Sequence, residues 1–405
     1  MTQLELGTPE DPIDELDLAA FFARLSECKD KNAGTHGLHP YPAKFIPHIP
    51  RALIRRFTRP GGLVWDPMCG SGTTLVEAAL SGRPAIGTDL NPIAALIARA
   101  KTVHLSTADR EALLRLVTAL FARRPPTPTL AWPQFPNRSL WFSDEVAQEL
   151  AHAKGMIDAL DSEAARAVAL CAFSAILVGV SNQESETRWC SRPNPAAPGS
   201  VCRRLAGKLA ETVRALGAYG RHAPAPVEVR VADARHAGLP AGSVASVVTS
   251  PPYANAHDYY LYHKLRLFWL GHDVGAVQQA EIGSRNRHSD QRQDIGVYVA
   301  EMRAVYAEIR RVLEPGATCS VVVADAVIRG ELFDVGELLG QVAVDEGLEP
   351  LEHHQFDHRQ FNTAFQRGFG TRFRKATHVL VHRRPSRTVG GAPTRARCCR
   401  AAPAR

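Results

Sequence analysis

The chain has 405 residues, 45% of them hydrophobic, and carries a formal net charge of +7. This length is enough to bury a large core and allows one elaborate domain or two. Seven arginines and no acidic residue follow His382, so the rest of the chain is neutral, and the overall charge alone does not indicate a nucleic-acid-binding surface.

Three features argue against a secreted, membrane-bound or metal-binding protein. The first twenty residues contain six acidic residues and no Lys or Arg, unlike a secretory signal. The longest uncharged apolar stretch, 167–180, is too short to span a bilayer and indicates a buried helix. The eight cysteines show no C-x-x-C pair and no metal-ligand spacing, which indicates reduced thiols. We therefore expect a cytoplasmic protein with neither a membrane nor a metal as partner.

The first part of the chain alternates strands with helices. Residues 1–30 are predicted to be an acidic segment with an amphipathic helix at 13–29. Residues 31–104 are predicted to form the cofactor-binding half of a sheet domain, with strands at 62–66 and 84–89 and helices at 48–57, 73–81 and 92–101. Such alternation predicts an α/β fold with a mostly parallel sheet covered by helices on both faces.

The strand pattern stops between Val103 and about Ala225. Helical periodicity dominates instead, over 107–123, 144–160 and 163–180, with a proline-rich break at 125–136. We interpret residues 105–226 as a mainly helical insertion and a candidate for target recognition.

Strands return in the last part of the chain, which is predicted to be the catalytic half of the sheet domain, residues 227–384. The expected strands are 227–233, 244–249, 318–323, 349–355 and 377–382. Residues 385–405 contain arginines, prolines and glycines with little to bury, and we expect a basic disordered tail.

The first strand runs directly into a glycine turn, Asp66-Pro67-Met68-Cys69-Gly70-Ser71-Gly72-Thr73. A strand, a glycine turn and a helix in this order hold a polar ligand at a helix N-terminus. A phosphate-binding loop would need Lys after Gly72, where Thr73 stands, and a dinucleotide fingerprint would need glycine at Leu75. S-adenosylmethionine fits better, because it has no phosphate but presents an amino-acid end, a ribose diol and an adenine.

The strand at 244–249 ends in a second informative string, Ser250-Pro251-Pro252-Tyr253. Together with the glycine turn, it resembles the amino-methyltransferases, which move a methyl group from S-adenosylmethionine to the exocyclic nitrogen of a nucleic-acid base. The serine form of the tetrapeptide is usual in the DNA cytosine-N4 enzymes of that family. The resemblance implies a class I methyltransferase fold, which is a Rossmann-like seven-stranded sheet, with S-adenosyl-L-methionine as cofactor and double-stranded DNA as substrate.

The resemblance also implies roles for acidic residues at three strand ends. Asp66 would lie near the methionine ammonium, Asp89 would accept the ribose hydroxyls, and Asp233 would accept the adenine amino group. The segment 39–45 resembles a family motif that packs beside the cofactor. The predicted cofactor-binding residues are Tyr41, Lys44, Phe45, Asp66, Pro67, Cys69, Gly70, Ser71, Gly72, Thr73, Asp89, Asn91 and Asp233.

The predicted catalytic residues are Ser250, Pro251, Pro252 and Tyr253. An exocyclic amino group is a poor nucleophile because its lone pair is delocalised, and hydrogen-bond acceptors for both amino hydrogens favour the reacting geometry. The Ser250 hydroxyl and the Pro251 carbonyl are candidate acceptors, and the two prolines stiffen this backbone. The ring of Tyr253 offers a face on which an extruded base can stack.

Other readings of the same residues stay open. Adenine-N6 enzymes usually carry Asp or Asn where Ser250 stands, so adenine is an alternative target base. RNA guanine-N2 methyltransferases usually show Asp-Pro-Pro-Tyr and a large module before the glycine motif. A catalytically silent nucleic-acid-binding protein is the alternative of another class. Methylation of cytosine at carbon-5 is disfavoured, because the chain has no Pro-Cys dipeptide to supply a thiolate.

Weaker signals concern the nucleic-acid surface and partners. The aromatic stretch 255–264 is expected to shape the base pocket. Two basic segments supply candidate nucleic-acid contacts at Arg285, Arg287, Arg367, Arg372 and Arg374. A modification enzyme of this kind would have a cognate restriction endonuclease as a partner.

Overall fold

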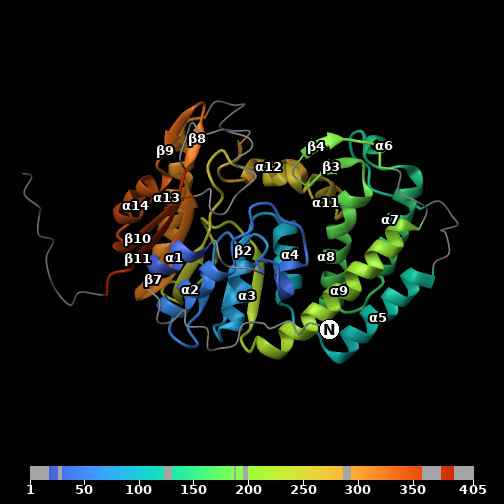
Figure 1. The fold of residues 1–405 in the computed structure, drawn as a ribbon, viewed down its shortest axis with the longest axis horizontal. Coiled ribbons are helices and arrows are strands. Elements are labelled where there is room, and N and C mark those ends of the chain that lie inside the picture. Colours follow the sequence, from blue (N-terminus) through green and yellow to red (C-terminus); the bar gives the residue numbers. More distant parts are fainter. Residues whose placement is uncertain are drawn as a thin grey trace, which may run out of the picture.

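The computed structural model describes residues 18–25, 30–122, 130–186, 188–194, 199–285, 293–357 and 375–386. Its centre is a seven-stranded sheet with the strand order β10-β11-β7-β6-β1-β2-β5 (Figure 1). The strands are β1 (Val64–Asp66), β2 (Ala85–Asp89), β5 (Val227–Val231), β6 (Val244–Thr249), β7 (Leu313–Ala324), β10 (Glu349–Asp357) and β11 (Ala376–Arg383). Strand β11 is antiparallel to both of its neighbours, and the other neighbouring pairs are parallel. This is the class I methyltransferase arrangement, as predicted.

Helices cover both faces of this sheet. They are α1 (Leu18–Arg24), α2 (His48–Phe57), α3 (Thr73–Leu80), α4 (Pro92–Thr102), α13 (Ile295–Val312) and α14 (Val335–Asp345). A 3-10 turn at Gly34–Gly37 precedes α2. The predicted helices at 48–57, 73–81 and 92–101 are confirmed, and α1 occupies the described part of the predicted helix at 13–29. Helices α13 and α14 are not among the predicted elements.

Alternating side chains of the buried strands divide between two hydrophobic cores. Val247 of β6 and Val321 of β7 pack with α13 and α14, whereas Val248 and Val322 pack with α1 to α4. Because side chains alternate along a strand, a run of consecutive apolar residues is what a sheet covered on both faces requires. The same reason explains why these strands were recognisable in the sequence.

The residues between α4 and β5 form a lobe beside the sheet, on the right in Figure 1. Its elements are α5 (Thr107–Ala122), α6 (Arg138–Trp141), α7 (Asp144–Asp158), α8 (Glu163–Val180), β3 (Gln183–Ser185), β4 (Arg188–Ser191) and α9 (Ser200–His222). The helices predicted at 107–123, 144–160 and 163–180 are confirmed. The expectation that no strand occurs here is wrong, because β3 and β4 form an antiparallel hairpin.

Helix α8 is the central helix of this lobe. Its 18 residues are long and apolar enough to cross a membrane by length and composition alone, but 67% of it is buried inside the protein. Its apolar side chains pack in a core shared with α5, α7 and α9. Helix α8 is therefore a buried core helix, as its apolar run predicted.

Short elements complete the edge of the sheet that carries the site. After β6 come α10 (Tyr259–Tyr262), α11 (Lys264–Trp269) and α12 (Val274–Ala280), and after β7 come β8 (Ala326–Ile328) and β9 (Glu331–Phe333). From β1 the sheet extends in one direction to β2 and β5, and β6 lies on the other side of β1. The position between β1 and β6, where the order of the strands reverses direction, is called the switch point. Open α/β sheets bind ligands there, outside the carboxyl ends of the strands. The glycine turn after β1 and the tetrapeptide after β6 both lie there.

Candidate active site

A pocket opens at this switch point, and most of the predicted residues line it. Eleven of the thirteen predicted cofactor-binding residues are in its wall, and Gly72 and Asp233 are the two exceptions. Ser250 and Pro252 of the tetrapeptide line the same pocket. The fold therefore brings together two motifs that lie far apart in the sequence.

The glycine turn adopts a backbone shape that favours glycine. Gly70 has φ of 49°, and its amide donates a hydrogen bond to the Asp89 carboxylate at 2.8 Å. Gly72 has φ of 79°, and a Cβ atom there would lie 2.8 Å from the Cβ of Ala98 on α4. Gly72 thus allows α3 and α4 to pack closely. Gly72 was predicted to bind the cofactor, but it does not line the pocket.

Asp66 and Asp89 are buried carboxyl groups at the ends of β1 and β2. Asp66 accepts a hydrogen bond of 2.7 Å from the Thr249 hydroxyl, which links the end of β1 to the residue before Ser250. Asp89 accepts from the backbone amides of Gly70 and Asn91, both at 2.8 Å. Burial raises the pKa of each carboxyl group to about 6. Both acids are therefore set to interact with a ligand that carries hydroxyl groups or positive charge.

The third acid, Asp233, does not face the pocket. Its carboxylate binds the guanidinium of Arg235 through contacts of 2.7 to 3.0 Å, and Ala234 lines the pocket in its place. The predicted contact of Asp233 with an adenine amino group is therefore not supported by its position. Because Arg235 stands only two residues after Asp233, this pair could be recognised from the sequence.

The charges of the pocket favour a cation over a phosphate. Its described lining contains three acids, Asp66, Asp89 and Glu281, and one basic residue, Lys44. The Lys44 ammonium donates to the Asn32 side chain at 2.5 Å and to the His36 carbonyl at 3.1 Å, so part of its hydrogen-bonding capacity is used elsewhere. A dinucleotide or nucleoside triphosphate would bring more negative charge into this site.

Other wall residues suit the neutral parts of S-adenosylmethionine. The Asn91 side chain caps α4 through its oxygen, but its buried Nδ2 has no partner among the described residues and can donate to a ligand. The ring of Tyr41 stacks on Tyr259 at 5.9 Å, and Phe45 also lines the wall. Hydrogen-bond acceptors, a free donor and aromatic surface are what a ribose and an adenine need.

The tetrapeptide contributes to the pocket unevenly. Ser250 and Pro252 line it, and Pro251 is buried and does not line it. The Tyr253 ring packs partly against the core formed with α13. The hydroxyl groups of Ser250 and Tyr253 lie 3.4 Å apart, and burial raises the pKa of Tyr253. Tyr253 is therefore a neutral phenol at physiological pH.

The loop after the tetrapeptide is anchored on both sides. Asn255 adopts φ of 57°, its side chain donates to the Val327 carbonyl of β8 at 2.8 Å, and its amide donates to the Gly283 carbonyl at 3.1 Å. Asn tolerates such a left-handed conformation better than most residues. These bonds fix the backbone that follows Tyr253.

Nine residues of the wall are absent from the predicted set, and Tyr259 and Glu281 are two of them. Tyr259 belongs to the aromatic stretch 255–264, which was expected to shape a base pocket. Glu281 follows α12 and has no motif around it, so its place in the wall depends on the tertiary fold alone. Its buried carboxylate accepts hydrogen bonds from the amides of Tyr259 and Tyr260 at 2.6 and 3.2 Å.

The predicted nucleic-acid contacts mostly lie outside the described residues. Arg285 is exposed at the end of a described segment. Arg287, Arg367, Arg372 and Arg374 lie outside the described part of the chain, so their role stays a prediction.

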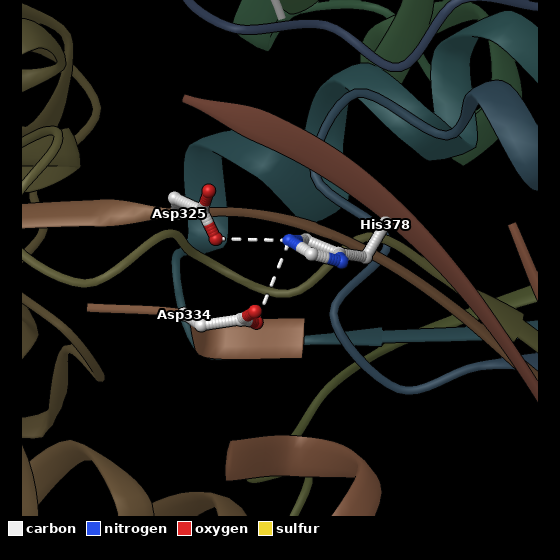
Figure 2. A group of neighbouring side chains, drawn as sticks. All are labelled: Asp325, Asp334 and His378. Atoms are coloured by element: carbon white, nitrogen blue, oxygen red, sulfur yellow. Dashed lines mark hydrogen bonds and ion pairs between the residues drawn. The ribbon is translucent and has the colours of Figure 1, made fainter. Parts of the chain in front are cut away.

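A second polar cluster joins β7, β11 and α14 (Figure 2). His378 Nε2 lies 2.9 Å from Asp325 Oδ1 and 3.6 Å from Asp334 Oδ1, and its Nδ1 lies 3.0 Å from His353 Nε2. Among the described residues, Asp325, Asp334 and His378 form the group of side chains that could hold a metal ion. The Asp325 and His378 atoms already pair with each other, so we interpret the cluster as a hydrogen-bonded network that ties these elements together.

We expect Asp325→Ala to lower the free energy of unfolding by about 1–3 kcal/mol, because the buried Nε2 of His378 loses its hydrogen bond to Asp325. Urea denaturation measures this change, and Glu331→Ala, at an exposed position of β9, is the control. Treatment with a chelator should leave the melting temperature of the wild type unchanged. A rise in melting temperature with Zn²⁺ that disappears in Asp325→Ala would contradict this interpretation.

Parts of this chain are similar to known DNA methylases. Residues 19–99 match the model of the DNA methylase family N6_N4_Mtase. The type II methyltransferase M.MjaII of Methanocaldococcus jannaschii is 41% identical over 87 residues, 22% of this chain and 16% of that protein. The type II methyltransferase M.MvaI of Kocuria varians is 30% identical over 158 residues, 36% of this chain and 35% of that protein. The chain thus matches about a third or less of the length of these relatives.

Solved structures resemble the chain more weakly but over more of its length. A SAM-dependent methyltransferase from Methanosarcina mazei is 11% identical, with a TM-score of 0.33, covering 86% of this chain and 100% of its own. The rRNA methyltransferase aviRa from Streptomyces viridochromogenes is 14% identical, with a TM-score of 0.31, covering 93% and 96%. The strand order of this chain, rather than these scores, identifies its fold.

Proposed function

We propose that this protein is an S-adenosyl-L-methionine-dependent DNA methyltransferase that methylates the exocyclic N4 of cytosine. The observation that carries the proposal is that Ser250 and Pro252 line the same pocket as Asp66 and Asp89. A base extruded into this edge of the sheet would meet the tetrapeptide beside the cofactor site. The match of residues 19–99 to the DNA methylase family supports DNA as the substrate.

The cofactor is S-adenosyl-L-methionine, which supplies an electrophilic methyl group on a positively charged sulfur when it is bound. Three acids in the wall suit its positive charges, and the Asp89 carboxylate is suited to the ribose hydroxyls. The Asn91 Nδ2 donor and the rings of Tyr41 and Phe45 suit the adenosine part.

The protein's own residues then act on the base. The Ser250 hydroxyl and the Pro251 carbonyl accept hydrogen bonds from the amino group, which favours a pyramidal nitrogen and disperses the positive charge that develops on it. Tyr253 provides a stacking surface for the extruded base, a contact of about 1–3 kcal/mol that offsets part of the unstacking cost. Cytosine is preferred to adenine on the strength of the serine at position 250. Residues 105–226 are the candidate for target recognition, a cognate restriction endonuclease is the proposed partner, and the proposed location is the cytoplasm.

The test is mass spectrometry of nucleosides from double-stranded DNA incubated with the protein and methyl-labelled cofactor. We expect the label in N4-methylcytosine. Label in N6-methyladenine would keep the mechanism but change the base, and label found only in RNA would change the substrate. Cofactor binding without any transfer would favour a catalytically silent nucleic-acid-binding protein.

A further inference from the structure

Glu281 is a buried carboxyl group in the wall of the active site. Its residue is 9% exposed, and it lines the pocket together with Ser250 and Pro252. It reaches this position from the end of α12, a segment that belongs to neither of the two motifs. A buried acid in a reaction pocket is a candidate for proton transfer.

The segment that carries Glu281 packs directly against the tetrapeptide loop. Ile282 lines the same pocket, and the Gly283 carbonyl accepts the Asn255 amide at 3.1 Å. A Cβ atom on Gly283 would lie 3.5 Å from the Pro252 carbonyl oxygen. Glu281 is therefore held on the tetrapeptide side of the pocket by the backbone contacts of Gly283, two residues after it.

The Glu281 carboxylate accepts hydrogen bonds from two backbone amides, those of Tyr259 and Tyr260. Burial raises its pKa to about 8, and the charges of Asp258 and Asp89 act in the same direction. The titratable groups that influence it, or that it influences, are Asp89 after β2, Asp258 before α10, Tyr259 and Tyr262 on α10, and Tyr41. All of them are acids or phenols, and Lys44, the basic residue of the pocket wall, is not among them. The positive charge that would act on Glu281 therefore comes from the ligand.

We propose that the Glu281 carboxylate accepts the proton that the methylated nitrogen loses, an inference that rests on the function proposed above. The amino nitrogen forms a bond to the methyl carbon, and the bond from that carbon to sulfur breaks with its electron pair left on sulfur. The nitrogen then carries a positive charge and gives one hydrogen as a proton to Glu281. The neutral carboxyl group later returns this proton to solvent, so no further reactant is needed.

The charge of the bound ligand determines whether Glu281 can accept a proton. While a positively charged ligand is bound, Coulomb attraction favours the carboxylate form of Glu281, which is the form that can accept a proton. Methyl transfer moves the positive charge from sulfur to the nitrogen, and this charge disappears when the nitrogen gives its proton to Glu281. Burial then favours the protonated form, so the proton stays on Glu281 until it is released to solvent.

Glu281 also has a structural role that the test must separate from proton transfer. It caps the start of α10 through two amides, and Glu149 does the same for α9 through the amides of Gly199 and Val201. Glu149 lies in the lobe and is outside the pocket wall. Glu149→Gln is therefore a matched control for the loss of a buried helix cap.

Calorimetry in buffers of different ionisation enthalpy measures protons released on ligand binding. At pH 7.5 we expect wild type and Glu149→Gln to release more protons with S-adenosylmethionine than with neutral S-adenosylhomocysteine. Glu281→Gln should show no such difference. Its single-turnover methylation of DNA should be about a hundredfold slower or more, and Glu281→Asp should recover part of the rate.

Equal proton release for the two ligands in wild type would overturn the proposal, and this result needs no variant to fold. A Glu281→Gln protein that methylates at the wild-type rate would also overturn it. If the wild type neither binds S-adenosylmethionine nor methylates DNA, the proposed function itself is wrong. The two failures are therefore distinguishable.

Discussion

Replacing Ser250 with Ala is expected to slow methyl transfer by about a hundredfold or more. Ser250 lines the pocket and follows the end of β6, next to Thr249, whose hydroxyl donates to Asp66. Loss of this oxygen removes an acceptor whose interaction grows as positive charge develops on the nitrogen. The affinity for S-adenosylmethionine should change little, because the cofactor acids and the glycine turn remain.

Single-turnover kinetics with saturating cofactor and DNA measures this effect, and calorimetry measures the cofactor affinity. Tyr253 offers the matched comparison, since its ring and its hydroxyl can be separated. Tyr253→Phe should stay near the wild-type rate, whereas Tyr253→Ala should weaken capture of the base by about 1–3 kcal/mol. A Ser250→Ala enzyme with the wild-type rate, or an equally damaging Tyr253→Phe, would exclude the assigned roles.

Local patterns in the sequence were enough to predict the sheet and many of the residues that line the pocket. The apolar runs before Asp66, Asp89 and Ser250 mark strands buried on both faces, and a ligand site at their carboxyl ends follows from parallel pairing. The glycine turn is recognisable because its backbone shape restricts residue choice, as the positive φ of Gly70 and Gly72 shows.

The parts that were missed have physical reasons. Helix α9 contains three glycines, Gly207, Gly217 and Gly220, which weaken a helical pattern in sequence, but its apolar face is buried against α5 and α8. The hairpin of β3 and β4 has strands of three and four residues, too short for a period of two to stand out.

The predicted site residues and the observed pocket wall differ at Asp233 and at Glu281 for the same reason. Asp233 satisfies the expectation for an acid after a strand, but the nearby Arg235 takes its carboxylate. Glu281 satisfies no sequence expectation, yet the fold buries it in the same wall as Asp89. Whether an acid faces the pocket depends on the residues that pack around it in the folded protein. The local sequence does not determine those neighbours.

Asp89→Ala should weaken S-adenosylmethionine binding by about 1.5–3 kcal/mol, the range for hydrogen bonds to a charged group. In calorimetry this corresponds to a dissociation constant roughly ten to a hundred times higher. The Asp89 carboxylate also holds the amides of Gly70 and Asn91, so Asp89→Asn, which keeps one acceptor oxygen, should lose less. Unchanged affinity in a folded Asp89→Ala protein would remove Asp89 from the cofactor site.

The control is Asp233→Ala, because the Asp233 carboxylate binds Arg235 and does not line the pocket. It should leave cofactor affinity nearly unchanged, and a loss as large as that of Asp89→Ala would support the predicted contact between Asp233 and the adenine.

The pH dependence of cofactor binding gives a second check of the cofactor site. Burial raises the pKa of Asp66 and Asp89 to about 6, so both are carboxylates above that pH and protonated below it. The affinity of the wild type for the cationic cofactor should therefore fall as the pH drops through about 6, and this dependence should be weaker in Asp89→Asn, which has one titrating acid fewer.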